Sequence, residues 1–175
     1  MSRVVERLLR CGSPAGRLPP CSGTISREAA YPGSVTMEKW FDLTRSVVMP
    51  ALCDIYGHLN VRHYAAFFDD AGWHLPAMAG LSLDEIRARG LGTVVATLTI
   101  DFHHEIRAGQ LVLIRGAVTR VGTKSFAHEL RLYEADSMTH CATQKTVEVC
   151  FDTAKRAAAP LPEDLRAKLA SLAPA

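Results

Sequence analysis

Apolar and polar residues alternate along several segments after residue 40, and this period of two predicts strands. The first strand covers 41–49 and ends before Pro50. The apolar residues on one of its sides are Phe41, Leu43, Val47 and Met49. Further strands are predicted over 94–103, 111–121, 125–134 and 141–152. Because their connections are short, we expect neighbouring strands to pair antiparallel.

A helical pattern, with apolar residues three and four positions apart, starts near Val61 and predicts one long helix closed by Gly80. Its apolar face contains Tyr64, Phe67, Phe68, Ala71, Leu75 and Met78. A short second helix is predicted after Ser82, because Ser82 and Glu85 form a capping-box pattern. One long apolar helix and one sheet with an apolar face predict an α+β domain in which the sheet wraps the helix.

The composition changes at residues 36–37 and predicts three parts of the chain. Residues 1–36 carry five Arg and two Glu and hold 8 of the 21 Gly and Pro residues, so we expect a largely disordered segment. Three interpretations remain open for it: a solvated tail, an upstream start before Met37, or a transit peptide. Residues 37–162 form the predicted domain. Residues 163–175 form a short amphipathic helix and tail, with Leu165, Leu169 and Leu172 on one face.

Charge and cysteine content exclude several classes of protein. The formal net charge is +2, which argues against a nucleic-acid partner. The sequence contains no run of about 18 apolar residues, so no membrane span is predicted. Five widely spaced cysteines fit neither a disulfide framework nor a structural zinc site, so we expect reduced thiols and no metal. These features predict a cytoplasmic protein, or a mitochondrial one if residues 1–36 are a transit peptide.

The loop between the first strand and the long helix carries the residues most relevant to chemistry. Its sequence runs DIYGHLNVRHY from Asp54 to Tyr64. A helix N-terminus presents unpaired N–H groups and partial positive charge, and a carboxylate just upstream can face the same place. That pairing is the minimum equipment for acyl transfer. The alternative is that Asp54 and Asn60 are only turn and cap residues, for which both types are common.

The stretch from Asp54 to Trp73, DIYGHLNVRHYAAFFDDAGW, resembles the signature of hot-dog-fold thioesterases of the 4-hydroxybenzoyl-CoA thioesterase type. Further similarity lies in Ile100–Phe102 with Arg107–Gly109, in Gly122–Phe126 and in the closing Pro160–Pro162. The resemblance covers about residues 40–162. It implies a hot-dog fold, which is an antiparallel sheet around one long central helix. The chain departs from the family pattern at Asp69-Asp70-Ala71, at Glu105 and at Gln110.

The resemblance also implies a mechanism that needs no cofactor. Asp54 is the implied catalytic carboxylate, acting either as nucleophile or as general base. The N–H of Val61 is the implied oxyanion donor. His58 has two open interpretations, a proton carrier or an imidazole that orients the loop. Gly57, Asn60 and Tyr64 are expected to shape the substrate site.

Coenzyme A carries phosphates, so cations are expected near the mouth of the site. The resemblance places Lys124 and Ser125 near the nucleotide, and Arg62 and Arg120 are further candidates; ordinary solvated charge is the alternative for all of these cations. The expected substrate is an acyl-CoA or an acyl-carrier-protein thioester. Self-association as a homodimer or dimer of dimers is expected, with the site at the interface.

Two other functions remain open at this point. A hot-dog hydratase or dehydratase pairs an Asp with a His five residues on, whereas His58 lies four residues after Asp54. A non-catalytic acyl-CoA-binding protein would keep the fold without turnover.

Overall fold

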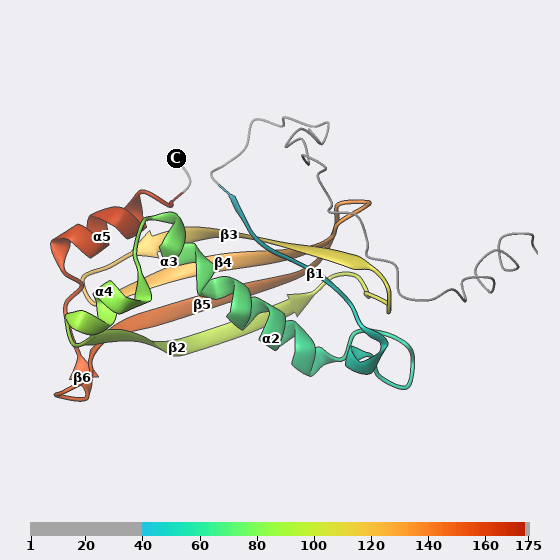
Figure 1. Cartoon of the computed structure of the whole chain (residues 1–175), viewed down its shortest axis with the longest axis horizontal. Helices are drawn as coiled ribbons and strands as arrows, with labels where there is room; N and C mark the ends of the chain where they lie inside the picture. The colour runs from blue at the N-terminus through green and yellow to red at the C-terminus, as the bar shows by residue number, and fades with distance from the viewer. Residues whose placement is uncertain (1–39, 174–175) are drawn as a thin grey trace, which may run out of the picture. The chain divides into compact units, whose positions relative to one another are not determined.

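The computed structural model describes residues 40–173, and these residues form an antiparallel sheet crossed by a helix (Figure 1). The strands are β1 (Phe41–Val47), β2 (Leu91–Phe102), β3 (Leu111–Val121), β4 (Ser125–Glu134), β5 (Thr139–Asp152) and β6 (Ala157–Ala158). Their order is β1-β3-β4-β5-β2, with β6 paired to β5. The predicted α+β architecture is therefore confirmed. The predicted boundary at residues 36–37 lies outside the described residues.

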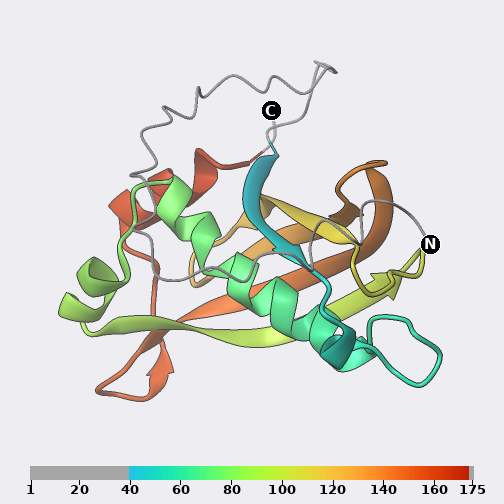
Figure 2. The same cartoon turned by 45° about the vertical axis from the view of Figure 1, so that its right-hand side comes forward.

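Helix α2 (Val61–Gly72) packs across one face of the curved sheet, as the turned view in Figure 2 shows. It buries Tyr64, Phe68 and Ala71, which join residues of β3, β4 and β5 in a core cluster. A short 3₁₀ helix, η1 (Pro50–Leu52), precedes the loop that leads into α2. This arrangement places the N-terminus of α2 and the preceding loop together at one end of the sheet.

The single long helix predicted from Val61 to Gly80 is wrong in one respect. The structure has two helices there, α2 and α3 (His74–Met78), separated at Trp73. Pro76 explains the break, because proline has no N–H to donate to the carbonyl four residues earlier and its ring clashes with that carbonyl. The residue four positions before it is Gly72, where α2 ends. The break leaves Met78 exposed rather than on the buried face.

The predicted orientation of β1 is also wrong at its C-terminal end. The pairing of β1 with β3 shifts register between Asp42 and Thr44, so the alternation of faces is reset there. As a result Val48 is fully buried, whereas Val47 and Met49 are exposed. A bulge is invisible to a simple period of two.

The C-terminal part of the chain builds a second core cluster at the other end of the sheet. Helix α4 (Leu83–Ala88) begins at Ser82, whose hydroxyl accepts a hydrogen bond from the Glu85 N–H, as predicted. Helix α5 (Glu163–Ala170) buries Leu165 and Leu169.

The described cysteines, Cys53, Cys141 and Cys150, are free thiols. Within residues 40–173, no helix has the length and apolar character that crossing a membrane requires.

Candidate functional site

The loop before α2 holds Asp54 in a tight turn. The Asp54 Oδ1 accepts hydrogen bonds from the N–H groups of Tyr56 at 2.8 Å and His58 at 3.3 Å. The backbone closes the same turn, because Gly57 N–H donates to the Asp54 carbonyl and Asp54 N–H donates to the His58 carbonyl. Gly57 has a φ of +80°, a conformation that favours glycine. The second carboxylate oxygen, Oδ2, has no hydrogen-bond partner among residues 40–173 and remains available to a substrate or a water.

The start of α2 leaves one N–H group unpaired. Asn60 caps the helix: its side chain accepts from the Arg62 N–H at 3.2 Å, and its carbonyl accepts from the His63 N–H at 2.9 Å. Val61, between them, is the first helical residue, and its N–H meets no acceptor in the described part of the chain. A free N–H at a helix N-terminus is a donor for negative charge. Asn60 is thus a cap, as the alternative interpretation held, and the cap leaves the Val61 donor open.

Asp54 and Val61 line the same cavity, which has a volume of about 370 Å³. Its other lining residues are His58, Leu59, Tyr64, Phe102, His103, His104 and Glu105. They come from the loop, from α2, from the end of β2 and from the segment after β2. The structure therefore brings four of the predicted residues to this cavity, namely Asp54, His58, Val61 and Tyr64. Gly57 and Asn60 lie in the same loop without lining the cavity.

His58 is held by an acidic partner, Glu105, and the sequence did not predict this contact. Its Nε2 lies 3.0 Å from the Glu105 carboxylate. The Arg107 guanidinium lies 2.6 Å from the same carboxylate and, with His58, holds the pKa of Glu105 below its usual range. A backbone bridge between His58 and Arg107 fixes the two segments side by side. This contact supports an orienting role for His58 and leaves it within the cavity.

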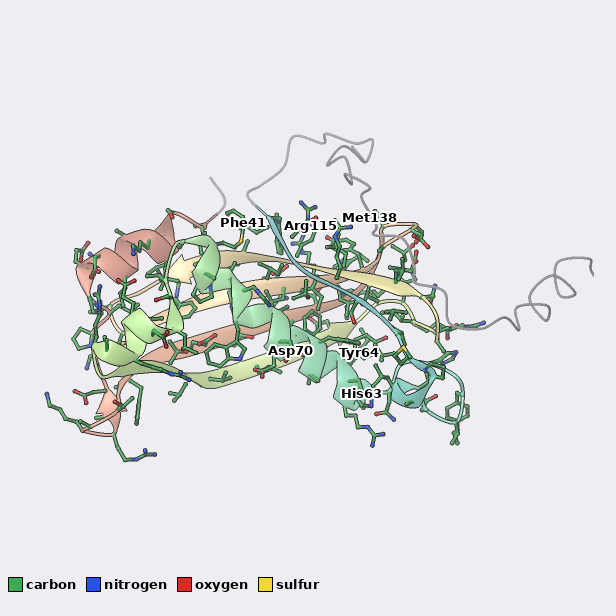
Figure 3. The ribbon with its side chains drawn as sticks, viewed as in Figure 1. Phe41, His63, Tyr64, Asp70, Arg115 and Met138 are labelled. Atoms are coloured by element: carbon green, nitrogen blue, oxygen red, sulfur yellow. The ribbon has the colours of Figure 1, made fainter. Side chains whose placement is uncertain are left out.

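Tyr64 closes the inner side of this cavity (it is labelled in Figure 3). Its ring meets Phe102 edge to face, with 5.0 Å between centroids. Burial raises the pKa of the phenol to about 12, so the hydroxyl stays protonated. We therefore assign Tyr64 to the wall of the site rather than to proton transfer.

His103, His104 and Glu105 form a further wall of the cavity. The His103 Nε2 lies 3.0 Å from the Thr143 hydroxyl, and the His104 Nδ1 lies 2.9 Å from the His140 carbonyl. The described residues contain no group of side chains arranged to hold a metal ion. Sequence reasoning missed these residues as part of the site, because only the folded chain brings the end of β2 next to the loop before α2.

The four predicted coenzyme A contacts divide into two places. Arg62 is exposed in the first turn of α2, beside the cavity. Lys124 and Ser125 lie in and after the turn between β3 and β4, and Arg120 lies near the end of β3. Since β3 spans about 30 Å at about 3.3 Å per residue, that turn lies far from the Asp54 end of the same chain. Within one chain these three residues do not line the cavity.

A buried histidine lies deeper in the structure, on β4. His128 is only 4% exposed, and burial lowers its pKa from 6.5 to about 4. Between about pH 6.5 and 4, His128 therefore binds a proton in the unfolded chain but not in the folded chain. Folding stability that is complete above pH 6.5 is lost as the pH falls through this range.

We expect His128→Leu to remove this loss of stability at acid pH. The His128 contribution to the free energy of unfolding differs by about 3 kcal/mol between neutral and acid pH. Glu148 is the facing ionisable group, and because burial raises its pKa it acts in the opposite direction in both proteins. Denaturant unfolding at several pH values measures the effect. If the free energy of unfolding depends on pH in the same way in wild type and His128→Leu, His128 is not the source of the acid destabilisation.

Comparisons with known proteins agree with the fold and identify a family. A family model described as the thioesterase-like superfamily matches residues 48–169. Comparison with curated proteins finds no match. The solved structure of Slr0204, a 1,4-dihydroxy-2-naphthoyl-CoA thioesterase from Synechocystis, is similar with a TM-score of 0.66 and 22% identity. The match covers 76% of this chain and 97% of that one.

Two further structures show the same fold. YbaW, a probable thioesterase from Escherichia coli, matches with a TM-score of 0.68 and 22% identity, over 76% of this chain and 99% of that one. SAV2348 from Staphylococcus aureus, solved in complex with CoA, matches with a TM-score of 0.71 and 16% identity, over 80% and 87%. The predicted hot-dog fold is thus confirmed by its neighbours. With most of its described residues inside the matched range, this chain belongs to the thioesterase-like superfamily and is a thioester hydrolase.

Proposed function

We propose that this protein hydrolyses an acyl-CoA, with Asp54 as the reacting carboxylate and the Val61 N–H as the oxyanion donor. The observation that carries the proposal is that an unpaired carboxylate oxygen and an unpaired helix N–H line one cavity. The test is release of free thiol across a panel of aliphatic and aromatic acyl-CoAs. Absence of turnover with every acyl-CoA of the panel would contradict the proposal.

The proposed reaction begins with the thioester carbonyl near the start of α2. Asp54 either attacks the carbonyl carbon, giving a mixed anhydride and CoA thiolate, or takes a proton from an attacking water. In both cases negative charge develops on the carbonyl oxygen, where the Val61 N–H and the positive end of α2 stabilise it. A thiolate has a conjugate-acid pKa of about 8.5, so it leaves without a strong general acid. His58, bound to Glu105, orients the loop.

We infer further that two copies of the chain associate through β2. This strand lies at an edge of the sheet, because it pairs only with β5 among the described strands. It also exposes Val94, Val95, Leu98 and Phe102. An exposed apolar edge strand is a template for pairing with another chain. Antiparallel pairing of two β2 strands would bring the Lys124 end of one copy towards the Asp54 end of the other, where CoA phosphates need cations.

The dimer is tested by one substitution on β2. Val94 is 44% exposed and does not line the cavity that holds Asp54. A twofold interface would contain a Val94→Lys change twice. We expect Val94→Lys to shift the protein to a 19.1 kDa monomer and to lower turnover, measured by light scattering and thiol release. Met138→Lys is the matched control, because Met138 is 46% exposed in the turn between β4 and β5. A dimeric Val94→Lys protein would contradict the assignment of this edge.

A further inference from the structure

A second cavity of about 340 Å³ lies between the helices and the sheet, beyond the first one along α2. A volume of this size accommodates a small-molecule ligand. Its walls are mainly apolar and include Phe68, Trp73, Pro76, Leu81, Ile86 and Leu98. These residues come from α2, α3, α4, β2 and the segments between them. The cavity is therefore suited to an apolar group.

The floor of this cavity is polar, which is unusual for a space under an apolar helix. It is formed by His128 of β4 and by Gln144, Thr146 and Glu148 of β5. His128 and Gln144 are 4% and 3% exposed. Both His128 ring nitrogens and the Gln144 Oε1 have no hydrogen-bond partner among residues 40–173. The His128 Nε2 lies 3.6 Å from the Glu148 Oε1, which is too long for a hydrogen bond.

Buried polar atoms without partners cost free energy, so a native structure that keeps three of them together needs a reason. We propose that this cavity binds the far end of the substrate's acyl chain and that its floor hydrogen-bonds a hydroxyl group carried there. The proposal rests on the proposed function, because it assumes that the acyl carbonyl lies at Asp54 and Val61. The substrate class is then the hydroxylated medium-length acyl thioesters.

The chemistry of the floor favours a hydroxyl over other polar groups. A neutral imidazole offers one donor and one acceptor, and the Gln144 Oε1 and the Glu148 carboxylate add acceptors only. The site therefore needs a ligand that donates a hydrogen bond and can also accept one, as a hydroxyl does. Glu148 and Asp69 line the same cavity and disfavour a carboxylate on the ligand.

The position of the cavity sets the length of the acyl group. Phe68 and Gly72 of α2 line it, and they follow Val61 by about 10 and 16 Å at a rise of about 1.5 Å per residue. Tyr64 and Phe102, which line the first cavity, each lie four residues from a residue of the second, Phe68 on α2 and Leu98 on β2. In the proposed complex the acyl chain runs from the Tyr64–Phe102 pair to Phe68 and Leu98. A single ring attached to the thioester carbonyl does not reach the floor, whereas an extended aliphatic chain does.

The first test compares matched substrates with the wild-type protein. We expect kcat/KM for ω-hydroxydodecanoyl-CoA to exceed that for dodecanoyl-CoA at least about tenfold, because a site with unpaired buried polar groups rejects an analogue that lacks the hydroxyl. Equal values, or a preference for the unsubstituted chain, would overturn the proposal. A preference for ω-aminododecanoyl-CoA over the hydroxyl compound would overturn it as well, in favour of a cation site.

The second test assigns the preference to the floor. Glu148→Gln keeps the shape of the side chain but replaces the carboxylate, and we expect the hydroxyl preference to fall about tenfold or more. Glu129→Gln is the matched control: Glu129 lies on β4, is 16% exposed where Glu148 is 17% exposed, and lines neither cavity. Gln144→Met should act as Glu148→Gln does. Thermal unfolding of each variant confirms folding. If folded Glu148→Gln keeps the wild-type ratio of kcat/KM between the hydroxylated and the unsubstituted substrate, the floor is not the source of the preference.

Failure of the proposed function is distinguishable from failure of this inference. If no thioester is hydrolysed, binding of the free acids by calorimetry examines the cavity alone. Tighter binding of ω-hydroxydodecanoic acid than of dodecanoic acid, with the difference reduced in Glu148→Gln and kept in Glu129→Gln, would support the site without any catalysis. Equal binding of the two acids would overturn it.

Discussion

Replacing Asp54 by Asn is expected to lower kcat by about 10²–10⁴-fold with little change in KM. The amide keeps an oxygen that can accept from the Tyr56 and His58 N–H groups, so the turn should survive. What it loses is the negative charge, and a neutral amide is a poor nucleophile and a poor base. Thiol release under saturating acyl-CoA measures the effect.

Two controls separate chemistry from structure in this experiment. Asp70→Asn makes the same chemical change at an exposed position of α2 that lines neither cavity, and it should leave kcat unchanged. Asn60→Ala removes the helix cap and should hurt less than Asp54→Asn, mainly through the geometry of the loop. If Asp54→Asn keeps kcat within a few-fold of wild type, the assignment fails and His58 becomes the next candidate.

Replacing Val61 by Pro should lower kcat by about 10²–10³-fold, the usual cost of one oxyanion-hole donor. Proline removes the N–H but suits the first position of a helix, where its fixed φ is compatible with helical geometry. The preceding Asn60 has φ −67° and ψ 140°, a conformation that a residue before proline favours. The substitution therefore deletes one donor while keeping the helix start.

Val61→Ala is the control for this variant, because it shortens the side chain and retains the N–H. It should keep most of the wild-type kcat. Circular dichroism and thermal unfolding establish that Val61→Pro is folded. A folded Val61→Pro protein with wild-type kcat would show that the oxyanion is stabilised by a different donor.

The pattern of apolar residues predicted most of the strands and helices because period and turn residues are local properties. It failed at the β1 bulge near Leu43, where one extra residue resets the faces of the strand. The sequence also predicted the loop from Asp54 to Tyr64, since caps, turns and the adjoining helix lie within a few residues of one another. Local reasoning is reliable where the site itself is local.

The parts of the structure that were not predicted depend on contacts between distant segments. The contact between the His58 imidazole and the Glu105 carboxylate joins two loops 47 positions apart in the chain. The polar floor was missed because Gln144, Thr146 and Glu148 alternate with residues such as Val147, and a polar face of a strand normally indicates the solvent side. Only the position of α2, α3 and α4 across the cavity shows that this face points inward.

The tight turn around Asp54 has a consequence for how such a protein can change over generations. The carboxylate, the glycine of the turn, the helix cap and the proposed oxyanion donor all lie within the eight consecutive residues from Asp54 to Val61. The lining of the second cavity is instead distributed over three strands and three helices. Under the proposed function, substitutions that alter which acyl group is accepted can therefore accumulate without touching the reacting groups. The reaction can then be inherited as one short segment while selectivity diverges around it.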